Sequence, residues 1–168
     1  SLRVAAAAIE EFQGADRRMQ RKGEARGVLV VDDYGHHPRE IAATLAALRE
    51  AVGPRRIVVL FQPHRFTRLA SLMDDFARCF KAADVLVLSD VYAAHEAPIA
   101  GADAATLAAK VRQHGPTDVT HAGSLELATQ HLIDRLERGD VALTLGAGSV
   151  GKTGDTILAA LGRTRESA

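Results

Sequence analysis

Five runs rich in apolar and β-branched residues divide the chain at intervals typical of an alternating α/β protein. They cover residues 28–31, 57–61, 85–88, 118–120 and 141–145. Four of them are almost continuously apolar, as expected for parallel strands that are covered on both faces. The sequence therefore predicts a strand at each of these positions.

Between these runs, apolar residues recur every three or four positions, which is the period of an amphipathic helix. The stripes are Ile41, Leu45, Leu48 and Val52; Ala104, Leu107, Ala108 and Val111; and Leu125, Ala128, Leu132 and Leu136. Pro38 suits the first turn of the first of these helices, where its missing N–H leaves no hydrogen bond unmade. Helices are therefore predicted between the strands.

Strands that alternate with helices predict one α/β domain of the Rossmann-like, doubly wound class. Residues 17–22, followed by Gly23, can add an antiparallel edge strand beside residues 28–31. The predicted fold is thus a mostly parallel sheet of about six strands with helices on both faces.

The overall charge excludes some partners and leaves others open. Lys and Arg number 21 and Asp and Glu number 21, so the formal net charge is zero and favours neither nucleic acid nor an anionic membrane. No apolar run approaches the roughly 18–20 residues that span a bilayer. Any anion that the chain binds must therefore be held by a local group of arginines.

Polar segments follow four of the predicted strands, at residues 32–38, 62–68, 90–96 and 146–149. In open α/β sheets, ligands bind beyond the carboxyl ends of the strands. Each segment alone also has a plainer interpretation, such as a turn capped by Asp33 or a solvated loop. Their coincidence at four strand ends favours a binding site, and Arg65 and Arg68 are spaced so that both can contact one anion.

The segment at residues 146–153 matches two nucleotide-binding patterns, GxGxxG and GxxxxGKT. A dinucleotide site needs a second strand with an acidic residue further on, and a phosphate loop needs a later magnesium-binding aspartate. Only about 15 residues follow, so we expect these glycines to form a tight turn beside a ligand or a neighbouring domain. A stand-alone nucleotide-binding module stays open as an alternative.

Five motifs in this order resemble the C-terminal domain of the Mur ligases: Arg17-Arg18-Met19, DDYGHHP from Asp32, QPHRFTR from Gln62, DVYAAHE from Asp90 and GAGS from Gly146. The resemblance spans essentially the whole chain. It implies that residues 1–14 end an inter-domain helix or linker from a central ATPase domain, and that residues 15–168 are the C-terminal domain. The isolated domain is then expected to be inactive.

The resemblance also implies an activity. Mur ligases are ATP-dependent amide ligases of peptidoglycan precursor synthesis in the bacterial cytoplasm, in which a carboxylate is activated as an acyl phosphate and attacked by an amine. DDYGHHP and QPHRFTR are most similar to the branch whose substrates are UDP-N-acetylmuramate and L-alanine; a related ligase that recycles a muramoyl peptide is the alternative. ATP with Mg²⁺ is implied as cofactor, the metal being held mainly by the central domain and not by this chain. The N-terminal and central domains are the implied partners.

Site residues follow from the same resemblance. The residues implied to serve ATP and catalysis are Arg18, Asp33 and His36. Those implied to bind the amino-acid and muramoyl substrates are His64, Arg65, Arg68, Tyr92 and Glu96. Arg17 is equally well interpreted as a functional or a solvated residue. The position of His95 is often glycine in this family, so the roles of Tyr92 and Glu96 depend on the path of that loop.

Overall fold

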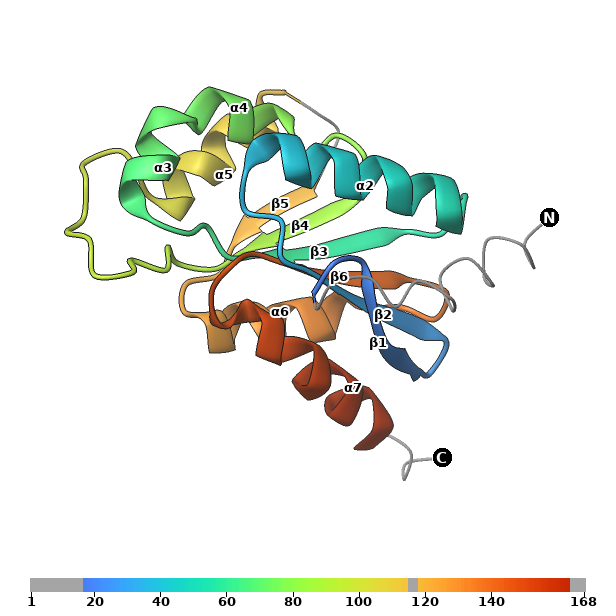
Figure 1. Ribbon diagram of the computed structural model, residues 1–168. Helices are drawn as coiled ribbons and strands as arrows, with labels where there is room; N and C mark the ends of the chain where they lie inside the picture. Colours follow the sequence, from blue (N-terminus) through green and yellow to red (C-terminus); the bar gives the residue numbers. More distant parts are fainter. Residues whose placement is uncertain (1–16, 115–117, 164–168) are drawn as a thin grey trace.

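The computed structural model describes residues 17–114 and 118–163, so the predicted linker at residues 1–14 lies outside the described residues. Six strands form one sheet in the order β1-β2-β6-β3-β4-β5 (Figure 1). The strands are β1 (Gln20–Ala25), β2 (Val28–Asp33), β3 (Ile57–Phe61), β4 (Val85–Leu88), β5 (Asp118–His121) and β6 (Val141–Leu145). β1 runs antiparallel to β2, and the other neighbouring pairs are parallel. The predicted fold class is confirmed.

The edge strand starts and ends three residues later than the sequence predicts. The residues between β1 and β2 are Arg26 and Gly27, with φ of 52° and 76°. Two positive φ values in a two-residue connection are typical of the type I′ hairpin turn, whose twist matches that of the strands. This turn pairs Ala25 with Val28 and sets the register of β1 as far as Gly23, beyond which an irregularity shifts it.

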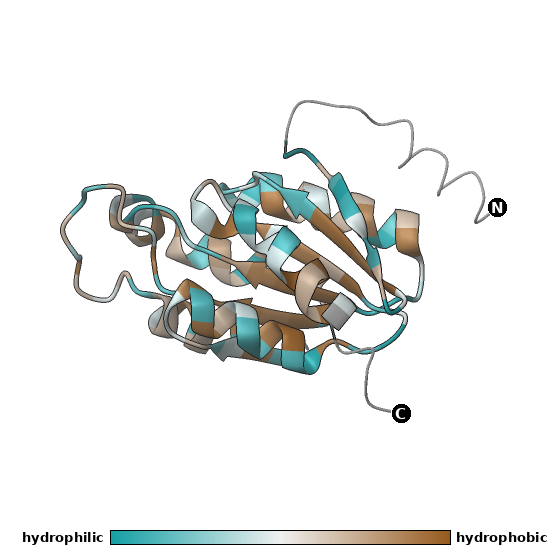
Figure 2. Cartoon of the chain, turned by 90° about the horizontal axis from the view of Figure 1, so that it is seen from below, coloured by the Kyte–Doolittle hydropathy of each residue, from teal (hydrophilic) through white to brown (hydrophobic). Residues whose placement is uncertain are grey.

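Helices cover both faces of the sheet (Figure 1). One face carries α2 (Pro38–Val52), α3 (Phe66–Ser71), α4 (Met73–Arg78) and α5 (Ala104–Arg112). The other carries α6 (Leu125–Arg135), the 3₁₀ turn η1 (Ser149–Lys152) and α7 (Thr153–Arg163). Figure 2 shows the apolar strands enclosed between helices whose outer sides are mixed or polar. Because both faces of the strands are buried, β2, β3, β4 and β6 consist of buried residues throughout, as their apolar runs predict.

Aromatic packing fixes α4 on the sheet. Phe61 of β3 lies with its ring centroid 5.9 Å from that of Phe76 and 5.2 Å from that of Phe80. Cys79, just beyond α4, is buried beside them, and its thiol donates to the Phe76 carbonyl. Burial raises the pKa of the Cys79 thiol, which makes it a packing group and a poor nucleophile.

Arginines tie together the amino ends of the parallel strands. Arg56 donates to both carboxylate oxygens of the buried Asp140, at 3.1 and 2.9 Å. Arg49 pairs with Asp84 and also donates to the Ala82 carbonyl. These arginines stabilise the fold. The residues predicted to bind ATP and substrates lie at the opposite edge of the sheet.

Candidate functional site

The four polar segments that follow β2, β3, β4 and β6 meet at the carboxyl edge of the sheet, as their positions predict. We call this edge the rim. The parallel register brings Asp33, Leu145, Phe61 and Leu88, the last residues of these strands, to one level. Beyond it the segments bond to one another, since Gly146 N donates to the Asp33 carbonyl at 3.2 Å and Arg65 N to the Tyr92 carbonyl at 2.9 Å.

Four aromatic side chains form a continuous row across the rim. The ring centroids of Tyr34 and His36 are 5.2 Å apart, those of His36 and His64 are 6.2 Å apart, and those of His64 and Tyr92 are 5.2 Å apart. The last two rings are stacked, with an interplanar angle of 14°. Tyr34 and Tyr92, at the two ends of the row, are 37% and 41% exposed. The aromatic row therefore offers π-faces to a ligand.

The two neighbouring arginines before β1 differ in their surroundings. Arg17 Nε donates to the buried Asp32 at 2.8 Å, and Arg17 Nη2 donates to the Gly146 carbonyl at 2.7 Å. Arg18 is more exposed, lies 6.0 Å from the Tyr34 ring centroid and reaches Glu40 only at 3.6 Å. Of the two, Arg17 is a structural link and Arg18 is the cation that a phosphate could approach.

Asp33 is enclosed by hydrogen-bond donors. Its Oδ2 accepts from Met19 N at 2.9 Å, and its Oδ1 accepts from Gly35 N at 2.7 Å and from the Thr44 hydroxyl at 3.2 Å. The residue is 2% exposed. In this state the carboxylate positions the turns before β1 and after β2, while direct contact with a nucleotide stays a prediction.

His36 lies over the first turn of α2. Its backbone N–H and that of His37 donate to the Glu40 carboxylate at 3.1 and 3.2 Å, and the capping box that Glu40 makes with His37 begins the helix with Pro38 in its first turn. Burial, the largest single influence, raises the pKa of Glu40. The two backbone donors and the charges of His36 and Arg18 outweigh it, so that the pKa is lowered overall. A carboxylate thus stands beside the predicted nucleotide-binding residues.

The arginines after β3 contact different partners. Arg65 lies 3.9 Å from Glu96, whose carboxylate also accepts from Thr67 N at 3.0 Å and from the Thr67 hydroxyl at 2.7 Å. The backbone and side-chain donors of Thr67 lower the pKa of Glu96. Arg68 instead binds His64. The spacing of Arg65 and Arg68 is compatible with one shared anion, but in the structure Arg65 lies beside Glu96 and Arg68 contacts His64.

The glycine-rich segment after β6 packs against side chains of its own domain. A Cβ on Gly148 would lie 2.5 Å from Gln62 Oε1, and one on Gly151 would lie 2.3 Å from the Arg17 guanidinium. Val150 N donates to Gln62 Oε1 at 3.2 Å. A phosphate loop needs free backbone N–H groups around an open space. Here Gln62 and Arg17 occupy that position, which supports the expected tight turn.

Gln62 and Asp32 belong to the site, although they are not among the residues that the sequence predicts to act there. Gln62 is 5% exposed and joins the segment after β3 to that after β6. Asp32 is 1% exposed and pairs with Arg17. Each directly follows an apolar run, at residues 28–31 and 57–61, and a polar residue in that position is the sequence signal that could have identified them.

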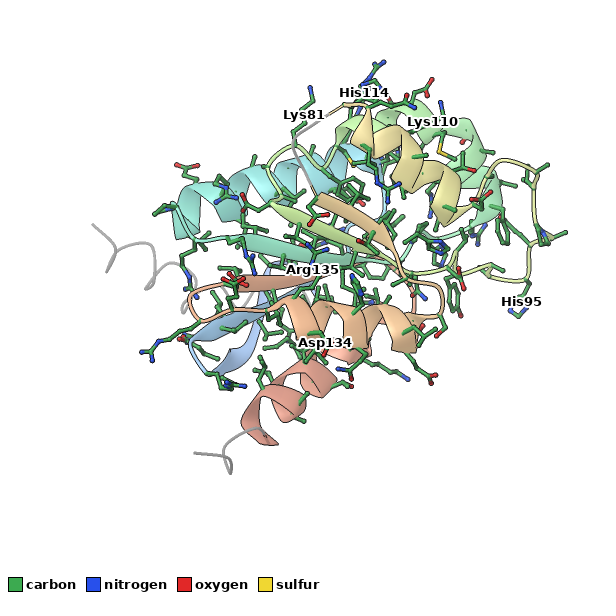
Figure 3. The ribbon with its side chains drawn as sticks, turned by 180° about the vertical axis from the view of Figure 1, so that it is seen from behind. Lys81, His95, Lys110, His114, Asp134 and Arg135 are labelled. Carbon is green, nitrogen blue, oxygen red and sulfur yellow. The ribbon has the colours of Figure 1, made fainter. Side chains whose placement is uncertain are left out.

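The loop after β4 takes a backbone path that normally needs glycine. Ala94 and His95 have φ of 49° and 70°, a conformation that costs an L-residue roughly 1–2 kcal/mol. Figure 3 shows His95 pointing away from the domain at the outer part of this loop. Glycine would adopt this backbone without that cost.

We expect His95→Gly to leave the free energy of unfolding unchanged or raise it by up to about 1 kcal/mol, because relief of strain exceeds the entropy that glycine adds to the unfolded chain. His95→Val should lower it by about 1 kcal/mol, since β-branched residues tolerate positive φ least. Urea unfolding of both variants tests this. A glycine variant less stable than the valine variant would contradict it.

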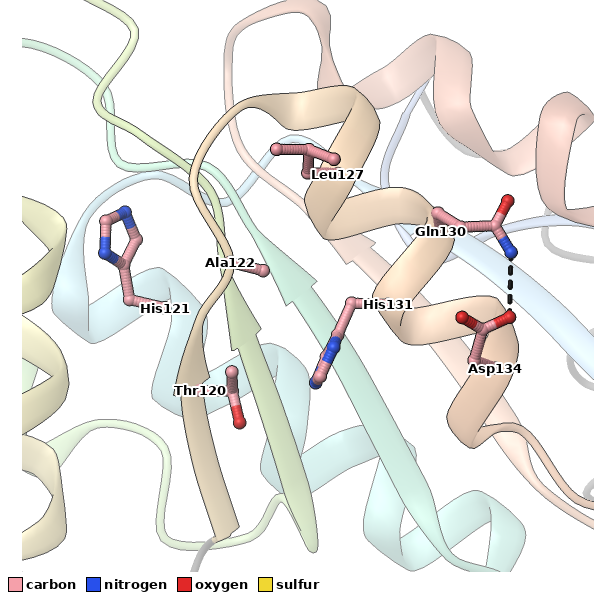
Figure 4. A pocket seen from close by; sticks show the side chains of 7 residues that line it. All are labelled: Thr120, His121, Ala122, Leu127, Gln130, His131 and Asp134. Carbon is pink, nitrogen blue, oxygen red and sulfur yellow. Dashed lines mark hydrogen bonds between the residues drawn. The ribbon is translucent and has the colours of Figure 1, made fainter.

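Other features of the described residues do not point to a second site. No three His, Cys, Asp or Glu side chains among them gather as metal ligands, and no helix among them is long and apolar enough to cross a membrane. A surface pocket of about 340 Å³ lies between β5 and α6 (Figure 4). It contains none of the predicted site residues, and Gln130 and Asp134 on its wall bond to each other at 2.8 Å.

Proteins of known name are similar to this chain over most of its length. The UDP-N-acetylmuramate–L-alanine ligase of Geobacter sulfurreducens is 51% identical over 156 residues, which are 93% of this chain and 34% of that protein. The chain thus spans about a third of the length of that relative.

Two solved structures share the fold. They are a UDP-N-acetylmuramate–alanine ligase from Thermotoga maritima, with a TM-score of 0.69, and a murein peptide ligase from Psychrobacter arcticus, with a TM-score of 0.71. Each is 23% identical; they cover 95% and 96% of this chain, and the chain covers 33% of each of theirs. The family described as Mur ligase, glutamate ligase domain, matches residues 17–148, and the chain belongs to this family.

Proposed function

We propose that the full-length protein containing this chain joins L-alanine to the carboxylate of UDP-N-acetylmuramate in peptidoglycan precursor synthesis, and that this chain is the domain that closes over the reacting groups. The observation that carries the proposal is the rim, where the DDYGHHP and QPHRFTR segments meet in one surface of aromatic rings and arginines. The 51% identity to a UDP-N-acetylmuramate–L-alanine ligase supports the choice of substrates. The bacterial cytoplasm is the corresponding location.

The chemistry needs fixed cations and a dry site. ATP supplies the phosphoryl group that activates the carboxylate, and negative charge then develops on oxygens that preorganised donors must stabilise. On this chain, Arg18 beside the exposed Tyr34 ring fits a nucleotide phosphate. Arg65, which is 52% exposed and only loosely paired, fits a substrate carboxylate. Closure of the rim over the other domains would exclude water.

Magnesium belongs elsewhere in this proposal. The acidic groups of the rim are engaged, since Asp32 pairs with Arg17, Asp33 accepts three donors and Glu96 accepts two from Thr67. Mg²⁺ prefers carboxylate and phosphate oxygens together with water. We therefore assign the metal to the central domain and the phosphates.

Two other functions are weaker candidates. A murein peptide ligase shares the fold at 23% identity. Identity this low supports a common fold and gives no support for a common substrate. A stand-alone nucleotide-binding module would use the glycine-rich segment, where Arg17 and Gln62 fill the necessary space.

The test is ATP-dependent phosphate release by the full-length protein, with UDP-N-acetylmuramate and L-alanine present together or singly. Release only with both substrates supports the proposal. Release with a muramoyl-peptide acceptor but not with L-alanine supports the recycling ligase. Substrate-independent hydrolysis by the chain alone would overturn the closing-domain role.

A further inference from the structure

The His64 ring is held by groups from three different segments. Arg68 Nη1, one turn on in α3, lies 3.3 Å from His64 Nδ1 and also donates to the His64 carbonyl at 3.2 Å. Tyr92 stacks on one side of the ring, and the His36 ring lies 6.2 Å away. The ring is therefore fixed in orientation, and its Nδ1 edge is turned toward a guanidinium.

A guanidinium can only donate hydrogen bonds, so the contact determines where the imidazole proton lies. Nδ1 must offer its lone pair to Arg68, and in the neutral ring the proton is then on Nε2. No hydrogen bond between described residues involves His64 Nε2. It is also not among the fully buried polar atoms without a partner, of which His131 Nε2 is an example. In this tautomer Nε2 carries the hydrogen that the ring can donate to a ligand.

The surrounding charges oppose a second proton on this ring. Burial is the largest cause of the lowered pKa of His64, followed by the charges of Arg68, His36 and Arg65. The charge of Glu96 acts in the opposite direction and is outweighed. Protonation would also place an N–H on Nδ1 against the Arg68 guanidinium and remove the hydrogen bond between them. Geometry and charge thus favour the same neutral tautomer.

We propose that His64 contacts the substrate as a neutral Nε2–H donor, and that Arg68 is a positioning residue that fixes this tautomer. The acceptor is an oxygen of the carboxylate substrate, and this assignment rests on the proposed function. His64 donates to that oxygen and does not take the proton from the attacking amine. Such a donor stabilises negative charge at neutral pH without any change in its own protonation.

The tautomer can be measured without turnover. In the full-length protein with ¹⁵N-labelled histidine, assigned by comparison with His64→Gln, we expect a pyrrole-like Nε2 and a pyridine-like Nδ1 at pH 7.5. Arg68→Met should yield a mixture of tautomers. A proton on Nδ1, or a doubly protonated ring, in the unaltered protein would overturn the proposal.

Kinetics provide an independent test, because a glutamine amide nitrogen lies near the position of Nε2 and an asparagine amide lies near that of Nδ1. We expect His64→Asn to lower kcat/KM by about 100-fold and His64→Gln by less than about 10-fold. In His64→Gln, the fall of kcat/KM toward acidic pH, the acid limb of the pH profile, should be retained. If His64 were the base, both variants would be equally impaired and that limb would disappear. Absence of turnover in the unaltered protein would count against the proposed function alone, since the spectrum does not depend on it.

Discussion

Replacing Arg65 with alanine is expected to lower kcat/KM of the full-length protein for its carboxylate substrate by about 10²–10³-fold, the usual cost of removing one donor to developing negative charge. Arg65 is the rim cation with the weakest contacts within its own domain. Its guanidinium is half exposed and approaches Glu96 only at 3.9 Å, whereas Arg17 and Arg68 are each engaged at two acceptors. It can therefore turn to a substrate at little cost.

Two further variants separate this role from others. Arg65→Lys keeps the charge but loses the paired N–H groups, so it should recover only part of the activity. Arg78→Ala removes an exposed arginine in the last turn of α4 and should leave the kinetics unchanged.

Stability must be measured beside activity, because Arg65 has φ of 72° and forms the N-terminal boundary of α3 without a side-chain cap. Alanine keeps that backbone cost and removes no buried contact, so the unfolding midpoint should not fall. Unaltered steady-state kinetics in Arg65→Ala would remove Arg65 from the site.

Three strands could be predicted to the residue, because β3, β4 and β6 each contain enough apolar residues to be recognised without their neighbours. The bounds of β3, β4 and β6 match the apolar runs at 57–61, 85–88 and 141–145. The convergence of the polar segments also follows from sequence alone, since parallel strands share one carboxyl edge. β1 was less predictable, because its ends depend on the turn at Arg26 and Gly27 and its residues are half exposed.

Which side chains pair with one another within the rim could not be predicted from the sequence. The spacing of Arg65 and Arg68 is compatible with one shared anion, but Glu96, 29 positions after Thr67, brings its carboxylate to the start of α3. Asp33 illustrates the same limit: its three donors come from before β1, from the next turn and from α2. Contacts of this kind depend on loop paths, which local propensity does not encode.

The largest stability effect is expected at Asp32, which the sequence shows only as the first of two aspartates. It is 1% exposed, and besides Arg17 its Oδ1 accepts from the buried Thr144 hydroxyl at 2.6 Å. Since Arg17 also holds the Gly146 carbonyl, the network joins the segment before β1 to the ends of β2 and β6. Asp32→Ala leaves Arg17 unpaired and the hydroxyl poorly satisfied, and we expect a loss of about 3–5 kcal/mol in the free energy of unfolding.

A matched comparison isolates burial as the cause. Lys110 and Asp74 form an ion pair with the same 2.8 Å separation, but their side chains are 40% and 71% exposed. Exposed pairs contribute little, so Asp74→Ala should unfold almost like the unaltered protein. In an Arg17→Ala background, Asp32→Ala should cost at least about 1 kcal/mol less than it does alone, because its charged partner is already gone. Denaturant unfolding of the four proteins of this cycle measures the coupling. Strict additivity would mean that Asp32 stabilises the rim through Thr144 and backbone packing and not through Arg17. Arg17 would then be available for the functional role that the sequence leaves open.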